Sequence, residues 1–113
     1  MKFLLAHLVG DYLIQRKWIA LRKGSSFWVA LLHGTTYALC YLVAYGWRVW
    51  PACIAISLTH SVQDYWWWNT KHPGRKWWGY DDSGIQIALA IVVDNTLHLL
   101  VNYVALTLCG VVV

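Results

Sequence analysis

The sequence predicts an all-α fold, an integral membrane four-helix bundle that forms a single domain over residues 1–113. Hydrophobic residues make up 59% of the chain and charged residues only 12%. Soluble domains average about 45–50% and about 25% for the same two classes. The apolar residues are gathered into four long stretches, and the basic residues lie mainly between them. A chain of this length has room for one domain and not for two.

The four apolar stretches give four expected helices, at about residues 2–20, 27–46, 51–68 and 85–110. The basic segment RKWIALRKGSS lies at the end of the first stretch, and the tight connection WRVWP follows the second. Pro51 suits the first turn of the third helix, where a missing N–H does no harm. A polar loop, NTKHPGRKWWGYDDSG, precedes the fourth helix. The fourth helix is long enough to cross a bilayer core of about 30 Å.

Basic residues are concentrated in two of the three connections. They are Arg16, Lys17, Arg22 and Lys23 in the first connection and Lys71, Arg75 and Lys76 in the third, against Lys2 and Arg48 on the other side. The positive-inside rule therefore predicts that both basic loops are cytoplasmic and both termini outside, in the cytoplasmic (inner) membrane. The net charge of +4 thus indicates topology rather than nucleic-acid binding, and the lipid bilayer is the expected partner.

Each of the three aspartates inside the predicted helices has a histidine four residues away. The pairs are His7 and Asp11 in HLVGD, His60 and Asp64 in HSVQD, and Asp94 and His98 in DNTLH. Residues four apart lie on the same face of a helix. With five histidines in the chain, three such matches would arise by chance in on the order of one sequence in a thousand.

The order of each pair follows the direction of its helix. The first and third helices run toward the cytoplasm and have histidine before aspartate, whereas the fourth runs outward and has aspartate first. All three aspartates are therefore expected nearer the cytoplasm, with the histidines about 6 Å further out. His33, in LLHGTTY, adds a residue from the second helix. We expect one polar cluster at one depth, built from all four helices.

Such a cluster needs a compensating charge, because an aspartate at the centre of a membrane helix costs about 2.5–3.5 kcal/mol. No lysine or arginine is expected at that depth. We therefore expect a divalent transition metal (Zn, Mn, Fe or Ni), as one ion or as two that share a carboxylate. Two alternatives stay open, since the carboxylates can orient the imidazoles instead or form a hydrogen-bonded scaffold without metal. The expected ligands are His7, Asp11, His33, His60, Asp64, Asp94 and His98.

The sequence resembles a family of small bacterial and phage membrane proteins known as domain of unknown function 3307. The matching segments are HLVGDYLIQ, LLHGTTYAL, LTHSVQD and DNTLH, in the family's order over nearly the whole chain. Two positions depart from the family pattern. Asn95 stands where glutamine is usual, and Trp67 where a lysine commonly follows the third-helix aspartate. The resemblance implies a membrane protein and no particular activity.

The leading functional hypothesis is metal-dependent hydrolysis of a phosphoester in a lipid or membrane-proximal substrate. Asp11, Asp64 and Asp94 would serve as catalytic residues, whether as ligands, as bridges or as a general base. A second hypothesis is metal-ion or proton transport through the same residues. A third is a structural or assembly subunit of a larger membrane complex. Assembly into a homo-oligomer is compatible with each hypothesis.

Overall fold

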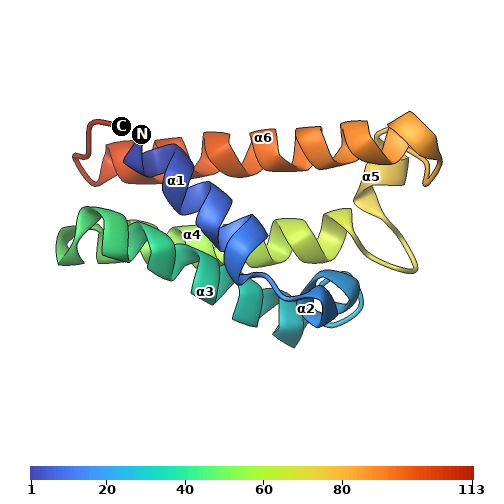
Figure 1. The fold of residues 1–113 in the computed structure, drawn as a ribbon, viewed down its shortest axis with the longest axis horizontal. Coiled ribbons are helices and arrows are strands. Elements are labelled where there is room, and N and C mark those ends of the chain that lie inside the picture. The colour runs from blue at the N-terminus through green and yellow to red at the C-terminus, as the bar shows by residue number, and fades with distance from the viewer.

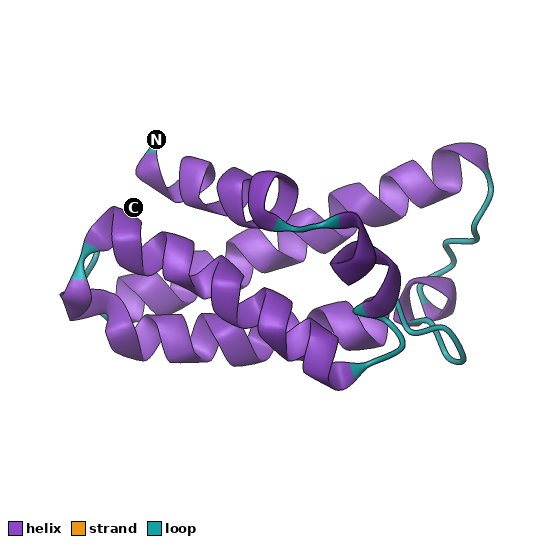
Figure 2. Cartoon of the chain, turned by 60° about the horizontal axis from the view of Figure 1, so that its bottom comes forward, coloured by secondary structure: helices purple, strands orange, loops and turns teal.

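The computed structural model describes residues 1–113 and consists of helices and their connections, without strands (Figures 1 and 2). The predicted all-α class is confirmed. The elements are α1 (Lys2–Leu8), the π-helix η1 (Val9–Ile14), α2 (Lys17–Arg22), α3 (Phe27–Tyr45), the 3-10 turn η2 (Trp47–Val49), α4 (Trp50–Trp67), α5 (Gly74–Trp77) and α6 (Gly84–Leu108).

The centre of the fold is an antiparallel hairpin of α3 and α4, on which the other helices pack. α6 runs along α4 for most of its length, and α1 crosses α3 obliquely (Figure 1). The two termini and the turn between α3 and α4 lie at one end of the molecule, whereas α2 and α5 lie toward the other. The molecule is elongated, with dimensions of 40 × 24 × 21 Å.

Three helices begin and end within two residues of the expected ranges, but the helix expected at residues 2–20 is interrupted. Gln15 and Arg16 adopt extended backbone conformations, with ψ angles of 111° and 155°. Before this break, η1 has the wider turn of a π-helix, a feature often found at functional sites. The break allows α2 to turn back toward the bundle. Lys23, which follows α2, then reaches the buried carboxylate of Asp64.

The close approach of α3 to α4 depends on Gly34. A Cβ atom at this position would collide with the Oγ of Ser61 and the carbonyl oxygen of Ser57. Small residues at a helix–helix contact let the two backbones approach closely. Toward the end that carries the termini, the hairpin and α6 enclose an apolar core that includes Ile56 and Leu106, both fully buried.

Only α3 and α6 are long and apolar enough to cross a membrane by themselves. The prediction of four such helices is therefore met only in part. α1 and η1 together cover residues 2–14, about 20 Å at 1.5 Å per residue, which is shorter than a bilayer core of about 30 Å. α4 has 18 residues, but His60, Ser61, Gln63 and Asp64 make its second half polar.

The long connection between α4 and α6 contains the short helix α5 and is held by charged groups. Arg75 donates hydrogen bonds to the carboxylate of Asp82 and to the carbonyl oxygen of Trp67. Lys76 is paired with the same carboxylate at 2.9 Å. The hydrogen bonds from Arg75 and Lys76 lower the pKa of Asp82 below its usual value. These contacts tie the connection to the end of α4.

Candidate metal centre

The structure brings two carboxylates and two imidazoles together in the middle of the bundle. The Oδ1 atom of Asp11 lies 3.2 Å from Nε2 of His33 and 3.4 Å from Nε2 of His60. The Oδ2 atom of Asp64 lies 3.2 Å from Nε2 of His60 and 3.5 Å from Nε2 of His33. These four side chains come from η1, α3 and α4, and their polar atoms face a common centre.

His98 of α6 joins this cluster through stacking. Its ring lies on that of His60, with centroids 3.9 Å apart and planes 17° apart, and Tyr37 stacks on the opposite face of His60 at 3.9 Å. The Nε2 atom of His98 is 3.9 Å from Asp64, and its Nδ1 atom is 3.9 Å from Asp94. The stack therefore fixes the imidazoles of two helices in one orientation.

Several polar atoms of the cluster are buried without a hydrogen-bond partner. They are both ring nitrogens of His98 and the Nδ1 atoms of His33 and His60. The Nε2 atom of His60 and the Oδ2 atom of Asp64 make no directed hydrogen bond either, but they lie in ion-pair contact at 3.2 Å. Most buried polar atoms in proteins are paired, because an unpaired one costs about 1–3 kcal/mol. Several such atoms in one place make the cluster a candidate site for a ligand.

The cluster contains three groups whose potential ligand atoms lie within 4.8 Å of one another, the spacing that a shared metal ion requires. Six of the seven residues predicted as ligands belong to these groups. The groups are Asp11, His60 and His98; His33, His60 and Asp64; and Asp64, Asp94 and His98.

His7 is the one predicted ligand that lies outside the three groups. Its Nε2 atom is 3.0 Å from Oδ1 of Asn95, and its Nδ1 atom is 2.7 Å from the hydroxyl of Tyr37. Asn95 uses its amide nitrogen to donate to the carbonyl oxygen of Ile91, so its Oδ1 is the acceptor. His7 therefore donates from Nε2 and accepts from Tyr37 at Nδ1. With both nitrogens engaged, His7 positions its neighbours, and its Nδ1 atom remains 3.4 Å from Asp11.

Asp94 is oriented by Gln63 of α4 and by Trp68, the residue that follows this helix. The amide nitrogen of Gln63 donates to its Oδ1 atom at 3.0 Å, and the indole nitrogen of Trp68 donates to its Oδ2 atom at 2.9 Å. These bonds hold the carboxylate at the edge of the cluster, further from the imidazoles than Asp11 and Asp64.

Lys23 was missed by sequence reasoning, and the expectation that no cation lies near the cluster is wrong. Its Nζ atom lies 3.1 Å from both carboxylate oxygens of Asp64, and the residue is only 9% exposed. The chain passes so close to α4 here that a Cβ atom on Gly24 would collide with the carbonyl oxygen of Trp68. Thr70 also donates to the carbonyl oxygen of Gly24. The glycine after Lys23 is the only sequence signal of this contact.

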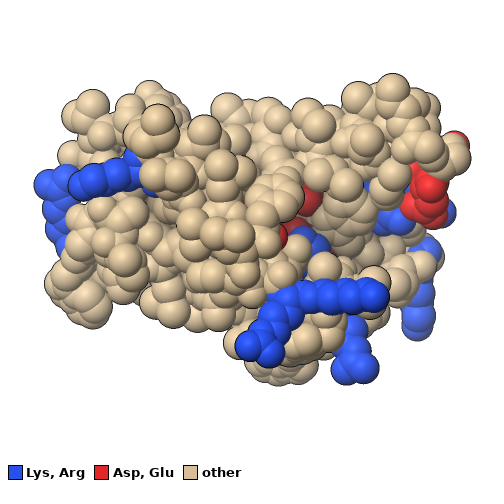
Figure 3. Space-filling view, in the orientation of Figure 1, with Lys and Arg blue, Asp and Glu red and all other residues tan.

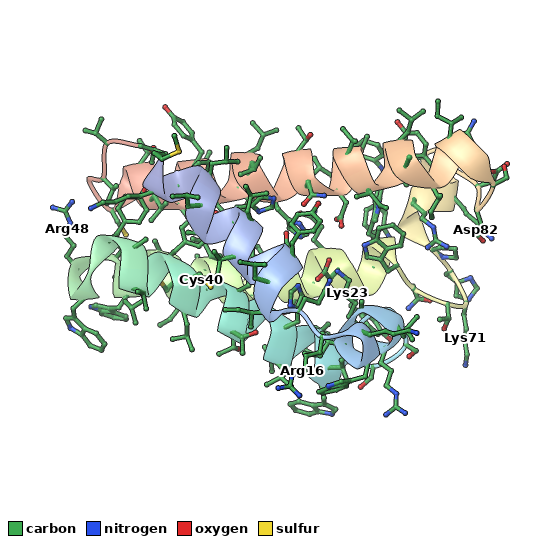
Figure 4. All side chains as sticks on the ribbon, in the orientation of Figure 1. Arg16, Lys23, Cys40, Arg48, Lys71 and Asp82 are labelled. Carbon is green, nitrogen blue, oxygen red and sulfur yellow. The ribbon has the colours of Figure 1, made fainter.

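A polar cavity connects the cluster to one side of the molecule. It has a volume of about 250 Å³. Figure 3 shows acidic and basic atoms in a hollow near the middle of the face, apart from the charged side chains at its ends and lower edge. Figure 4 shows Lys23 near the centre of the bundle, whereas Arg16 and Lys71 lie at its periphery. The lining residues are Asp11, Tyr12, Gln15, Ala20, Lys23, Trp68, Ile91, Asp94 and Asn95.

The opposite side of the cluster is closed. Asn102 donates hydrogen bonds to the hydroxyl groups of Tyr37 and Tyr41. Beyond this group lie Val49 and Leu106, both fully buried in the apolar core. The polar interior therefore opens at one side and ends within the bundle.

The fold and the cluster define an all-helical protein with a buried histidine–carboxylate centre that is reached from one side. The model of the family described as "Protein of unknown function (DUF3307)" matches residues 1–112, and the chain belongs to this family. The resemblance seen in the sequence is thus confirmed. None of the curated proteins and none of the solved structures matches the chain.

Proposed function

We propose that this protein is an integral membrane hydrolase that uses one divalent transition metal ion to cleave a phosphoester in a lipid or membrane-proximal substrate. The observation that carries the proposal is the convergence of buried imidazole and carboxylate atoms, several of them without a hydrogen bond, beside a cavity that opens at one side only. Such hydrolases usually combine a metal ion with histidine and carboxylate side chains in a pocket that is closed at one end.

Exposed apolar side chains support the location in a membrane. Leu39 and Val43 of α3, Leu58 of α4, and Val104 and Leu108 of α6 are all at least half exposed. The longest dimension of 40 Å is close to the thickness of a bilayer with its headgroups, about 40–45 Å. In this proposal α3, α4 and α6 cross the bilayer, and α1 with η1 enters it from the end that carries the termini.

The positions of the basic residues support an orientation in the cytoplasmic membrane. The connections around α2 and α5 carry most of the basic residues, whereas the end with the termini carries Lys2 and Arg48 (Figures 3 and 4). The positive-inside rule then places α2 and α5 on the cytoplasmic side and both termini outside.

The charge of the cluster favours a single divalent ion. With the carboxylates of Asp11, Asp64 and Asp94 ionised and the imidazoles neutral, as a metal site requires, the one positive charge of Lys23 leaves a net charge of two negative. Buried charge is costly unless it is compensated. One Zn, Mn, Fe or Ni ion supplies the missing two positive charges, and imidazole with carboxylate is a ligand set that such ions accept. A second divalent ion would leave an excess of positive charge.

The three carboxylates differ in their suitability for catalysis. Asp11 and Asp64 face His33 and His60 and are the candidate ligands. A bound ion would supply an acidified water and polarise a phosphoryl oxygen. Asp94 lines the cavity and is oriented by hydrogen bonds from its neighbours. It is therefore the candidate general base, within reach of a water that enters from the cavity.

The experiment that tests this proposal combines metal analysis with a hydrolysis assay on detergent-purified protein. We expect about one transition metal ion per chain and metal-dependent release of phosphate or alcohol from bis(4-nitrophenyl) phosphate or a short-chain phosphatidate. Asp94→Asn should retain the metal and lose about 10²-fold to 10⁴-fold in rate, the usual share of a general base. A loaded protein that cleaves neither compound would contradict the hydrolase proposal and favour transport or a structural role.

Gly10 provides a test of the geometry of η1. A Cβ atom at Gly10 would press on the ring of Tyr37, so Gly10→Ala should push η1 away from α3 and move Asp11 from His33. We expect zinc affinity to fall about 10-fold to 100-fold, as it does when groups that orient metal ligands are changed. Competition with a zinc-binding dye measures this loss. Leu13→Ala, at a side chain that is 79% exposed on the same helix, is the control. Unchanged affinity in Gly10→Ala would show that Asp11 is no ligand.

A further inference from the structure

Lys23 lies between the cluster and the cavity. Its ammonium group contacts both oxygens of Asp64 at 3.1 Å. The same side chain lines the polar cavity. It is held by a short connection and not by a long helix, because the extended residues Gln15 and Arg16 separate α2 from η1. Because Lys23 both contacts Asp64 and lines the cavity, a change in its side-chain torsions would be enough to turn its ammonium group from the carboxylate to the cavity.

Asp64 cannot pair with the Lys23 ammonium group and bind a metal ion equally well at the same time. Its Oδ2 atom belongs to the Lys23 ion pair and also faces His33 and His60, with which it forms one of the candidate ligand groups. Two positive charges within a few ångströms in a buried site repel each other strongly. A metal ion held by His33, His60 and Asp64 would compete with the ammonium group for Asp64 and displace it toward the cavity.

Besides Lys23, the cavity contains a second hydrogen-bond donor for an anion, the hydroxyl group of Tyr12. Tyr12 accepts a hydrogen bond from the amide nitrogen of Asn95 at 2.9 Å, so its own hydroxyl hydrogen is available. Trp68 and Gln63 direct their donors to Asp94 instead. A displaced Lys23 and the hydroxyl of Tyr12 would thus face the same space, and ammonium–phosphate bonds are among the stronger hydrogen bonds.

We propose that metal binding creates a phosphate subsite at Lys23 and Tyr12, and that this subsite takes the headgroup of an anionic phospholipid from the cytoplasmic leaflet. The inference rests on the proposed function and specifies its substrate. The cavity, at about 250 Å³, has room for a phosphate with a short substituent.

The surroundings of the cavity favour a lipid over a soluble phosphate. Ile91, which lines the cavity, is 41% exposed. Leu13, the neighbour of the lining residue Tyr12 in η1, is 79% exposed. Trp18 and Leu21 expose further apolar surface on α2, next to basic residues of the same segment. A phospholipid could place its phosphate at Lys23 while its acyl chains remain against this apolar surface.

Isothermal titration of detergent-purified protein with inorganic phosphate tests the metal-dependent subsite. We expect phosphate to bind at least about tenfold more tightly to protein loaded with one equivalent of zinc than to metal-free protein. By reciprocity, phosphate should tighten zinc binding by the same factor. Lys23→Met should remove this coupling, and Lys17→Met, at an exposed lysine of α2, should leave it unchanged.

The wild-type comparison with and without zinc needs no variant, so a folding defect in Lys23→Met does not decide the result. Equal phosphate affinity in both states, or full coupling in folded Lys23→Met, would overturn the subsite while the metal centre stands. A protein that binds no metal would overturn the proposed function and the subsite together. A protein that shows the coupling but no hydrolysis would overturn the hydrolase alone.

Three short ligands identify the source of the phosphate group. Dihexanoyl phosphatidate should bind zinc-loaded protein more tightly than glycerol phosphate, because its acyl chains gain contact with the apolar surface beside the cavity. Dihexanoyl phosphatidylcholine should bind weakly, since its phosphodiester has less negative charge than the phosphomonoester of phosphatidate and its quaternary ammonium group is repelled by Lys23. Equal affinity for phosphatidate and glycerol phosphate would overturn the lipid assignment and indicate a soluble phosphate compound.

Discussion

Replacement of both His60 and Asp64 by alanine should abolish stoichiometric metal binding. Each of the three candidate ligand groups contains His60 or Asp64 or both, so no group survives the double substitution. The metal content of purified protein, measured by mass spectrometry after dialysis against zinc or manganese, should fall from about one ion per chain to background. Any bound metal that persists in the double variant would place the ion elsewhere.

Two controls separate this loss from misfolding. His60→Gln/Asp64→Asn keeps the size and polarity of both side chains while it weakens ligation, and it should also lose the metal. His72→Ala changes a histidine in the exposed connection after α4 and should retain it. Far-ultraviolet circular dichroism and gel filtration of all variants should show the same helix content and size.

Lys23→Met should strongly destabilise the metal-free protein and affect the metal-loaded protein much less. The substitution leaves the fully buried carboxylate of Asp64 without its cation. Removal of one partner of a buried ion pair typically costs about 3–5 kcal/mol. A bound divalent ion restores positive charge beside Asp64, so zinc should recover most of the loss. Denaturant unfolding followed by circular dichroism, with and without zinc, measures both free energies.

Lys17→Met is the matched control, because it removes a lysine from the exposed face of the same segment. It should change the free energy of unfolding little, as exposed charges contribute little to stability. An equal loss of stability for Lys23→Met with and without zinc would show that metal and lysine do not share Asp64. No loss in either state would show that the ion pair is unimportant for folding.

The parts of the fold that sequence could predict are those determined by local composition. α3, α4 and α6 follow from long apolar runs, because burial of such runs depends on the residues themselves. The π-helix η1 and the break at Gln15 leave no trace in hydropathy. Both depend on distant contacts, namely the packing of Gly10 against Tyr37 and the pairing of Lys23 with Asp64.

The residues of the cluster also divide into those that local sequence predicts and those whose positions depend on distant contacts. A spacing of four residues on a helix fixes which side chains share a face, so the convergence of the aspartates with His33, His60 and His98 was predictable. The role of His7 was not, because its partners Tyr37 and Asn95 come from other helices. The basic residues around Lys23 suggested that it lies in a loop. It reaches the interior only because α2 turns back toward the bundle.

One of the three ligand groups, formed by His33, His60 and Asp64, belongs entirely to the α3–α4 hairpin. During synthesis this hairpin leaves the ribosome before α6, and chains fold from the N-terminal side first. A three-ligand group therefore emerges from the ribosome before Asp94 and His98 do. The last helix then adds to a centre that is already in place, and cation capture can guide its docking.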